Sequence, residues 1–537
     1  MKKLLLLFTL GFACLCLQAQ NIERPKLVVG IVIDQMRWDF LYRYYNRYAA
    51  DGGFRRLLSD GFSCENTMIS YLPSITACGH TAIYTGSVPA IHGIAGNDWE
   101  DRATQKIVYC TEDPTVKTVG STGNAGEMSP RNLLATTITD ELRLATNFQS
   151  KVIGVALKDR GSILPAGHSA NAAYWYDPQS GNWVTSTYYM QELPKWVNDF
   201  NARKLTDKYY DQNWNTLYPV NTYVQSQSYN SQALKTQGTK RFPYSLQQFK
   251  GKNYGILSAT PYGNTMTMEF ARTAITEEQL GAGAATDFLT ISFSSTDYIG
   301  HAYGPNSIEE EDAYLRLDHD LGELLSFLDT KIGKKQYLVF LSADHGAAHA
   351  PWFLQEHNIP AGNVSIFLAD SLNKALRTIY NRDSLVTNVI NYQVFLNTSL
   401  INRAHLNKKE VIANIIPVLL KIKGIERAFD IEEVSNVPIP VKLQDMIKNG
   451  YYPKRSGDIQ IIYSPQWIEG FENSGTTHGV WNPYDTHIPL VWYGWHIRQG
   501  SSNHEVYITD IAPTIAALLH IQMPSGCIGK VIEEVGK

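Results

Sequence analysis

Aspartate and histidine residues follow three apolar runs of the sequence and recur in one later loop, a combination that could bind divalent metal ions. The first run is "KLVVGIVID", the second is followed by "STDYIGH", the third ends in "SADHG", and the loop is "GTTHG". The candidate ligands are Asp34, Asp297, His301, Asp344, His345 and His478. A single aspartate at a strand end is more often a turn residue than a ligand. The joint pattern indicates a metal site.

The number and kind of these ligands indicate two metal ions. Six ligands exceed the four of a tetrahedral zinc ion. Imidazole and carboxylate groups without cysteine suit zinc, and several other divalent ions less well. Two metal ions about 3.5–4 Å apart can bind the attacking and leaving oxygens of an in-line phosphoryl displacement. The ligand set is therefore typical of phosphoryl transfer at two zinc ions.

A second group of reactive side chains lies in "PSITACGHTAIYTG", which runs from a turn of small residues into a buried helix. Ser74, Thr76 and Cys78 could each be a nucleophile, and each could equally be a helix cap. A free hydroxyl is a poor nucleophile near neutral pH, and metal coordination is one way to activate it. The helix N-terminus would also favour an approaching anion.

Two cations follow another apolar run, in "LKDRG". Lys158 and Arg160 alternate, so both side chains can share one face at the end of a strand, and arginine can bind two oxygens at once. A phosphate monoester carries nearly two negative charges, whereas a diester carries one. Two cations at this position favour monoesters, and the alternative interpretation is a solvated basic pair.

The elements that must position these residues alternate between strands and helices. Apolar runs at 26–34, 151–157, 287–294 and 336–344 are typical of strands buried on both faces of a parallel sheet. We expect a helix starting with Ser129 as N-cap, and another in which Ser307 and Glu310 form a capping box. Along this second helix Tyr314, Leu317, Leu321, Leu324 and Leu328 repeat at helical spacing. The segment "EEED" at 309–312 is interpreted as a solvated first helical turn. "GDIQIIYS" and "HIPLVWYG" continue the pattern, which predicts an α/β fold with a mostly parallel central sheet between helices.

Two stretches interrupt this pattern, and a third precedes it. Residues from about 167 to 254 are rich in Tyr, Trp, Asn and Gln and are expected to form an aromatic-rich cap over one end of the sheet. Residues from about 370 to 451 are expected to form a small α+β subdomain. Residues 1–19 combine a basic start, a short apolar run and a small residue at position 19, as in a secretory signal peptide. Residues 20–537 would then be the exported catalytic chain, periplasmic or secreted, without a membrane anchor.

Composition excludes some partners and a cysteine scaffold. The net charge of −4 provides no basic field for nucleic acid. After the signal segment, four cysteines remain in about 500 residues, with no CxxC spacing for a thiolate zinc site. One disulfide is conceivable, between Cys64 and Cys110. We expect a monomer.

Several motifs in order resemble those of the alkaline phosphatase superfamily, and most closely the phosphate-irrepressible, PafA-type alkaline phosphatases. They are "VIDQMRWDF", "PSITACGHTAIYTGSVPAIHGIAGNDW", "LKDRGSILPAGH", "STDYIGHAYGP", "SADHGA" and "GTTHGVWNPYDTHIP". The resemblance runs from Lys26 to the C-terminus. It implies a periplasmic, zinc-dependent phosphomonoesterase of broad specificity with the fold of that superfamily.

The resemblance also implies roles for individual residues. Thr76 would be the nucleophile that forms a phospho-threonine intermediate, while Ser74 and Cys78 would be structural. Matching positions assign one zinc ion to Asp34, Asp344 and His345, the other to Asp297, His301 and His478, and phosphate binding to Asn97, Lys158 and Arg160. The remaining histidines are interpreted as structural, with His349 and His487 as candidates for contacts behind the ligands.

Two other functions compete with this one. A phosphodiesterase or nucleotide pyrophosphatase on the same scaffold would have Lys158 and Arg160 turned away from the site, and the aromatic-rich segment would form a nucleotide pocket. A non-catalytic, metal-stabilised binding protein of the cell envelope would tolerate the loss of Thr76.

Overall fold

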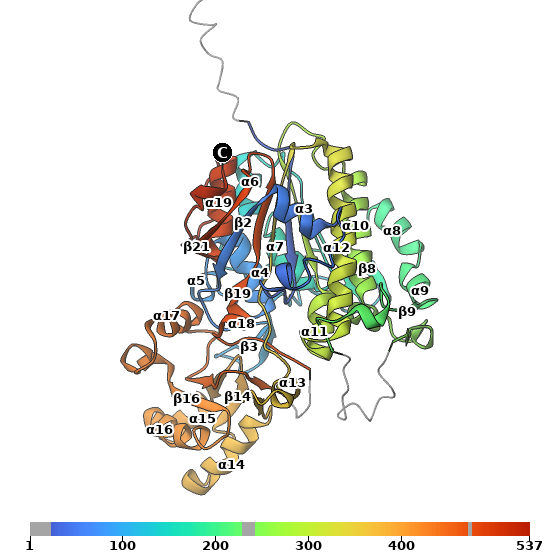
Figure 1. Ribbon diagram of the computed structural model, residues 1–537. Coiled ribbons are helices and arrows are strands. Elements are labelled where there is room, and N and C mark those ends of the chain that lie inside the picture. The colour runs from blue at the N-terminus through green and yellow to red at the C-terminus, as the bar shows by residue number, and fades with distance from the viewer. Residues whose placement is uncertain (1–22, 228–241, 471–474, 537) are drawn as a thin grey trace, which may run out of the picture.

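The computed structural model describes residues 23–227, 242–470 and 475–536. A large mixed sheet carries helices on both faces, and a smaller sheet lies beside it (Figure 1). The expected signal segment, residues 1–19, falls outside the described residues. In the described part of the chain, no helix has both the length and the apolar character needed to cross a membrane.

Five parallel strands form the middle of the large sheet. Their residues are buried throughout, as expected for apolar runs covered on both faces. In spatial order they are β12 (Tyr337–Ser342), β1 (Leu27–Ile33), β11 (Asp287–Phe293), β6 (Val152–Ala156) and β7 (Ala172–Asp177). The predicted α/β sheet is confirmed, and the strands that precede the candidate ligands are neighbours.

Further strands extend this parallel centre at both edges, mostly in antiparallel pairs. Beyond β12 lie β20 (Leu490–Gly494), β2 (Phe62–Met68), β19 (His487–Ile488) and β21 (Gly500–Tyr507), and beyond β7 lie β8 (Asn182–Ser186) and β5 (Thr118–Val119). The segment "HIPLVWYG" thus contains two strands of the main sheet, β19 and β20, and β20 runs antiparallel to β12. The site is built on the five-stranded parallel centre, and the other parallel pair described in this sheet, β2 with β21, lies near its edge.

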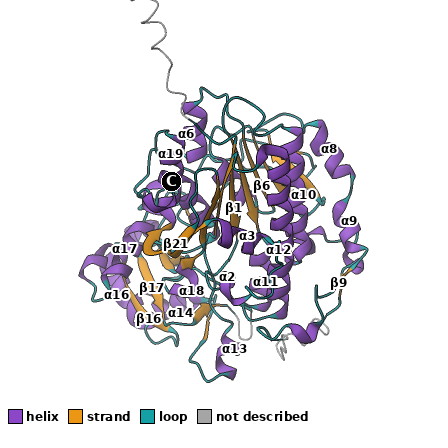
Figure 2. Ribbon diagram, turned by 45° about the horizontal axis from the view of Figure 1, so that its top comes forward, coloured by secondary structure: helices purple, strands orange, loops and turns teal. Residues whose placement is uncertain are grey.

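Two groups of helices cover the sheet (Figures 1 and 2). The first comprises α3 (Gly53–Asp60), α10 (Pro261–Glu277) and α12 (Ile308–Leu328), and the second comprises α4 (Thr76–Thr85), α6 (Ile138–Ala145), α7 (Asp159–Ala166) and α19 (Ile511–Leu519). The leucines that repeat at helical spacing along α12 are all buried. The amphipathic pattern therefore predicts the buried face of this helix correctly.

The helix expected at Ser129 begins later. Its N-cap is Thr137, which forms a capping box with Asp140. Ser129 instead donates a hydrogen bond to Asp113, 2.6 Å away. The reciprocal bonds of Thr137 and Asp140 satisfy two backbone donors of the first turn, so the helix starts there and not at the proline that follows Ser129.

The acidic turn at the start of α12 is buried, and the expectation of a solvated turn is wrong. Residues 309–312 are each at most 2% exposed. Trp214 and Tyr223, from the aromatic-rich segment, donate hydrogen bonds to Asp312. The Ser307 hydroxyl accepts a bond from the Glu310 amide, which is one half of the predicted capping box. Packing by a distant segment decided the burial here.

The aromatic-rich segment begins inside the main sheet, because β7 and β8 fall within the range 167–254. After β8 the chain forms α8 (Lys195–Ala202) and α9 (Leu205–Tyr210), which lie outside α10 (Figure 1). Trp183 stacks on Phe270 of α10 with ring centroids 4.2 Å apart. The aromatic side chains of this segment thus enlarge the hydrophobic core.

A second sheet is formed from four antiparallel strands with their own hydrophobic core. Its order is β14 (Val386–Ile390), β15 (Gln393–Leu396), β17 (Ile459–Tyr463) and β16 (Ile425–Asp430), and α14 (Leu368–Tyr380) and α16 (Lys408–Leu419) pack on it. The segment "GDIQIIYS" contains β17, so assigning it to the main sheet is wrong. The small subdomain expected at about 370–451 therefore extends further along the chain, because β17, one of the two inner strands of this sheet, follows residue 451.

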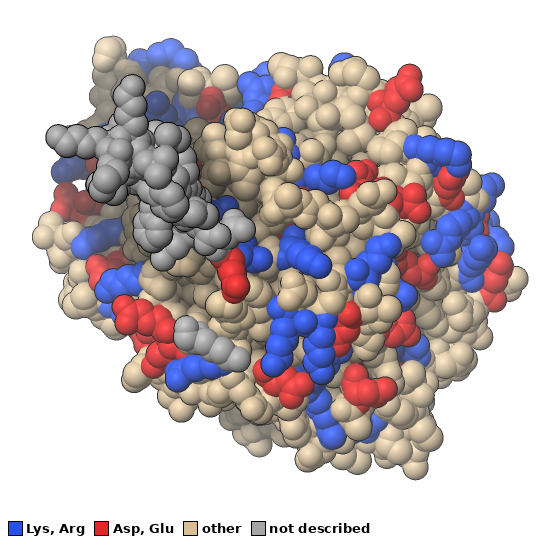
Figure 3. Space-filling model, turned by 90° about the horizontal axis from the view of Figure 1, so that it is seen from above, with Lys and Arg blue, Asp and Glu red and all other residues tan. Residues whose placement is uncertain are grey.

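The four cysteines after residue 22 are free. Cys64, Cys78 and Cys110 are buried, and Cys527 is partly exposed. The disulfide considered between Cys64 and Cys110 therefore does not form. The face shown in Figure 3 carries basic and acidic side chains interspersed, without a large area of one sign.

Gly30 in β1 provides a test of the packing beneath the site. A Cβ at this position would lie 2.3 Å from the Tyr84 hydroxyl and 2.6 Å from the ring of Phe340. We expect Gly30→Ala to lower the free energy of unfolding by about 1–3 kcal/mol through overpacking. Gly283→Ala, in an exposed loop with open space, is the control. Chemical denaturation measures both, and equal stability of the two variants would contradict the packing described.

Candidate active site and metal centre

The candidate ligands meet at the carboxyl ends of adjacent parallel strands. Asp34 follows β1, and Asp344 and His345 follow β12. Asp297 lies in the first turn of α11 (Ser295–Tyr303), directly after β11. Lys158 follows β6 and is the N-cap of α7. Because these four strands are neighbours, side chains as far apart in the chain as Asp34 and His345 share one edge of the sheet.

Two groups of three side chains bring their ligand atoms within 4.8 Å of one another. The first is the predicted set of Asp34, Asp344 and His345. The second contains Asp297 and His478 together with His345 in place of the predicted His301. His301 Nε2 nevertheless lies 3.1 Å from Asp297 Oδ1. The structure brings all six predicted ligands together, with His345 at the boundary between the two groups.

The three candidate histidines are oriented by backbone carbonyls. In each ring, Nδ1 hydrogen-bonds to a carbonyl oxygen at 2.8–2.9 Å, and the acceptors belong to Gly346, Thr476 and Ser74. A carbonyl can only accept, so Nδ1 carries a proton, and in a neutral ring Nε2 keeps the lone pair that can bind a metal ion. Second partners of this kind are typical of histidines that bind metal ions.

Buried carboxylates give the site an excess of negative charge. Burial raises the pKa of Asp34 well above its ordinary value, and the charges of Asp297 and Asp344 raise it further. Asp34 Oδ1 is buried and has no hydrogen-bond partner among the described residues. Burial also lowers the pKa values of His345 and His478, which favours the neutral imidazole that binds metal ions. The donor set therefore fits divalent cations.

Lys158 provides part of the missing positive charge. Its ammonium group lies 2.6 Å from Asp34 Oδ2 and 2.5 Å from Asp297 Oδ2. Burial alone would lower the pKa of Lys158, but the charges of Asp297 and Asp34 outweigh it and raise that pKa. For Asp297 the effect of burial is opposite, since it would raise the pKa of the carboxyl group. The charges of His301 and Lys158 outweigh burial and hold that pKa well below its ordinary value. Lys158 is therefore a cation bound between two candidate ligands.

Thr76 is the one side chain of the three candidate nucleophiles that contacts the cluster. It is the first residue of α4, it is buried, and its Oγ1 lies 3.3 Å from His345 Nε2. The N-cap of α4 is Ile75, so the interpretation of Thr76 as a cap is wrong. The Ser74 hydroxyl donates to Val480 O, and the Cys78 thiol donates to Ile94 O. Those two side chains contact backbone away from the carboxylates.

Asn97 contacts the first turn of α4, and Arg160 lies in the first turn of α7. Asn97 Oδ1 accepts a hydrogen bond from the Ala77 amide at 3.0 Å, which orients its NH2 group. Arg160 donates to the Tyr109 hydroxyl at 2.9 Å, and its buried Nε has no partner among the described residues. Lys158 and Arg160 lie at the start of a helix, so the strand-end geometry expected for them is replaced by that of a helix N-terminus.

Two further residues contact the site, and sequence reasoning missed both. Gln35 has a positive φ of 65°. Its backbone N–H donates a hydrogen bond to Asp344 Oδ1, and its side-chain Nε2 donates one to Asp297 Oδ1, so Gln35 connects the two ligand groups. His80 lies one turn after Thr76; its Nδ1 contacts Thr76 O and is 3.2 Å from Asp344 Oδ2. The i,i+4 spacing from Thr76 was the available signal for His80.

Other histidines lie behind or away from the cluster. His349 contacts Asn306 Oδ1, and His487 contacts Glu65 O and stacks on Trp38. His487 is thus a structural residue, and the contact expected between His349 and Asp344 does not form among the described hydrogen bonds.

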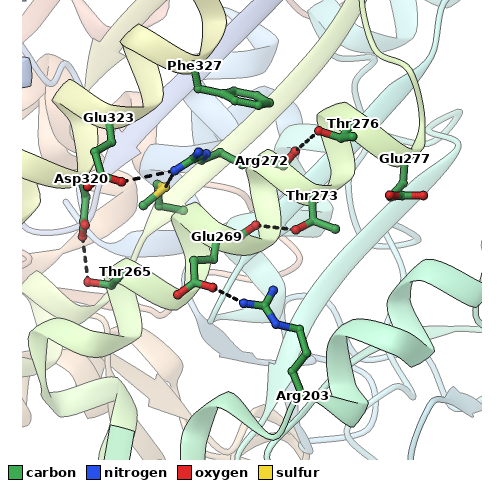
Figure 4. A pocket seen from close by; sticks show the side chains of 11 residues that line it. Arg203, Thr265, Glu269, Arg272, Thr273, Thr276, Glu277, Asp320, Glu323 and Phe327 are labelled. Carbon is green, nitrogen blue, oxygen red and sulfur yellow. Dashed lines mark hydrogen bonds and ion pairs between the residues drawn. The ribbon is translucent and has the colours of Figure 1, made fainter. Parts of the chain in front are cut away.

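A pocket of about 520 Å³ lies elsewhere, between α10 and α12 (Figure 4). Arg203 pairs with Glu269 at 2.6 Å and Arg272 with Glu323 at 3.3 Å, so both arginines at its wall are paired with carboxylates. None of the candidate ligands lines it. The pocket is separate from the candidate active site.

Comparisons with known proteins agree with this arrangement. Residues 28–485 match the family described as type I phosphodiesterase / nucleotide pyrophosphatase. Alkaline phosphatase PhoV of Synechococcus elongatus is 52% identical over 523 residues, which cover 96% of this chain and 94% of PhoV. A Myroides odoratus protein named calcium-transporting ATPase is 52% identical over 534 residues, which cover 97% of each chain.

Alkaline phosphatase PafA provides both a sequence and a structural comparison. PafA of Elizabethkingia meningoseptica is 49% identical over 520 residues, which cover 96% of this chain and 95% of PafA. A crystal structure of PafA matches with a TM-score of 0.94 at 48% identity and covers 96% of this chain and 100% of that one. The chain therefore belongs to the type I phosphodiesterase / nucleotide pyrophosphatase family and, within the alkaline phosphatase superfamily, to the group that contains PhoV and PafA.

Proposed function

We propose that this protein is a zinc-dependent alkaline phosphatase that hydrolyses phosphate monoesters of broad specificity through a phospho-threonine intermediate. The observation that carries the proposal is the position of Thr76 Oγ1, 3.3 Å from His345 Nε2 at the edge of a buried carboxylate and imidazole cluster. The alkaline phosphatases PhoV and PafA align with nearly the whole chain, which supports the same reaction here.

Asp34, Asp344 and His345 would hold one zinc ion, and Asp297, His301 and His478 the other. When bound, such ions polarise phosphoryl oxygens and favour ionised hydroxyl groups near neutral pH. Thr76 would attack phosphorus, and the ester oxygen would leave. Water would then cleave the Thr76–phosphate bond, releasing inorganic phosphate and restoring the hydroxyl. Backbone N–H groups at the start of α4 would favour the anionic phosphoryl group.

The preference for monoesters would come from Asn97, Lys158 and Arg160. Lys158 already carries a positive charge in the site, and Arg160 Nε is buried without a partner among the described residues. A monoester presents more negative charge to these donors than a diester does, so its transition state would gain more from them. Little besides the phosphoryl group need be bound, which supports broad specificity.

The family description favours one second candidate, a phosphodiesterase or nucleotide pyrophosphatase. That function needs a surface for the second organic group of the substrate. In the described part of the aromatic-rich segment, Trp183, Tyr210 and Trp214 are at most 1% exposed, whereas Tyr188 is 39% exposed. The orientation of Lys158 into the site, between Asp34 and Asp297, supports the monoesterase.

Lys158→Ala separates the two candidates. We expect hydrolysis of an aryl phosphate monoester by the zinc-loaded protein to be strongly preferred over the matching diester. The substitution should lower kcat/KM for the monoester by about 10²–10³-fold and that for the diester much less. Lys151→Ala, at the opposite end of β6, is the control. A preferred diester, or a silent Lys158→Ala, would overturn the assignment of the substrate.

Thr76→Ala tests the nucleophile and the binding-protein alternative. We expect the variant to lose turnover by more than about 10³-fold while retaining two zinc ions per chain, measured by elemental analysis. Thr76→Ser should keep activity, and Ser74→Ala is the control because its hydroxyl contacts Val480 O. Acid-quenched protein should yield a phosphopeptide containing Thr76. Unchanged turnover in Thr76→Ala, or zinc-free protein that is fully active, would contradict the mechanism.

We also propose that the chain is exported to the periplasm or the medium. Lys2, Lys3 and the apolar run that follows support this. N-terminal sequencing of the exported protein should begin at Gln20. Recovery of the full chain from the cytoplasm alone would contradict export.

A further inference from the structure

The second sheet meets the active site through a two-residue turn. Asn391 and Tyr392 connect β14 to β15, whose flanking residues Ile390 and Gln393 pair directly. Both turn residues have positive φ values, 55° and 61°. Two-residue hairpins of this kind prefer Asn followed by Gly, because only glycine adopts this backbone without steric cost. A tyrosine at the second position therefore calls for a reason outside the turn.

The Tyr392 side chain reaches the loop of a candidate metal ligand. Its hydroxyl donates a hydrogen bond to His478 O at 2.7 Å. Its ring lies against Gly479, where a Cβ would lie 2.5 Å from ring atom Cε2. The Tyr392 carbonyl accepts from the Ile461 amide in β17 at 2.9 Å, so the residue is itself anchored in the second sheet.

The neighbouring Asn391 reaches a candidate phosphate-binding residue in the same way. Its Nδ2 donates to Asp98 O at 2.7 Å. A Cβ on Gly96 would lie 2.3 Å from the same Nδ2 atom. The turn thus packs against the residues on both sides of Asn97. At each of the two contacts, the residue next to the functional side chain is a glycine, which leaves room for the turn.

We propose that the Asn391–Tyr392 turn is a positioning device that ties the loops of His478 and Asn97 to the second sheet. His478 is then held at two points, by Tyr392 at its backbone and by Ser74 O at its ring Nδ1. These loops are far apart in the chain, and the turn sets the backbone of one relative to that of the other. The inference rests on the proposed function, since it concerns its metal and phosphate ligands.

The first experiment compares Tyr392→Phe with Tyr463→Phe. Tyr463 packs edge-on against Tyr392 in the same sheet, and among the described residues no hydrogen bond joins its hydroxyl to the His478 loop. Zinc-loaded proteins are mixed with a coloured chelator, and zinc release is followed with time. We expect Tyr392→Phe to bind one of its two zinc equivalents about tenfold more weakly, as for other partners of metal ligands, so that the chelator removes this equivalent faster. Tyr463→Phe should match the unsubstituted protein.

The second variant, Asn391→Gly, suits the turn and removes only the side-chain contact to the Asn97 loop. We expect unchanged zinc release and a several-fold weaker inhibition by inorganic phosphate, and thermal denaturation confirms that each variant is folded. Zinc release from Tyr392→Phe at the unsubstituted rate would overturn the inference and leave the proposed function standing. Failure of the unsubstituted protein to take up zinc would overturn both.

Discussion

The burial of three carboxylates at one edge of the sheet is the constraint on which the site depends. Asp34, Asp297 and Asp344 are each at most 3% exposed, and an ionised carboxylate is stable in such surroundings only with a cation or several hydrogen-bond donors nearby. Lys158 provides one ammonium group between two of them. One charge does not balance three, so the edge of the sheet is arranged for additional positive charge. Divalent metal ions satisfy that requirement and supply the chemistry as well.

The parallel centre of the sheet creates this concentration of charge. In β6, β11, β1 and β12 the carboxyl ends coincide, and a ligand or Lys158 follows each strand within a few residues. Strand neighbours contribute side chains that lie far apart along the chain. The antiparallel strand β20 begins at the same edge, and the loop that carries His478 precedes it, ahead of α18 (Pro483–Thr486). The sheet therefore assembles the ligands, and the backbone carbonyls around it orient their rings.

The second sheet shows how an insertion can contribute to a site that it does not contain. Its core is separate from that of the main sheet, and its strands hold none of the candidate ligands. Its contacts near the site come from a turn with an unfavourable backbone, whose side chains hydrogen-bond to the carbonyls of His478 and Asp98. A strained turn persists where the surrounding contacts outweigh its cost. Here those contacts are with the loops of the candidate active site.

Much of the site could be predicted from the sequence because the signals are local. Apolar runs without polar interruption indicate buried parallel strands, and the aspartates that follow them must lie at the carboxyl edge. The six candidate ligands and the two cations were accessible from these patterns, whereas the choice of Thr76 and Asn97 came from the resemblance of the motifs to those of the alkaline phosphatase superfamily. The leucine spacing of α12 likewise identified its buried face.

Other features depend on segments that meet only in the folded chain. The acidic turn at 309–312 looks solvated in sequence, but aromatic residues from a distant segment bury it. The strand in "GDIQIIYS" is apolar enough for either sheet, and pairing with β15 and β16 decided its place. Gln35 and His80 carry no signal of their own beyond their position next to Asp34 and one turn after Thr76.

The sequence by itself determined the elements and the chemical types of the ligands, because these follow from short-range pattern. The tertiary structure alone decided which strands pair, which charges are buried and which side chains share a ligand, because those outcomes depend on packing between residues hundreds of positions apart.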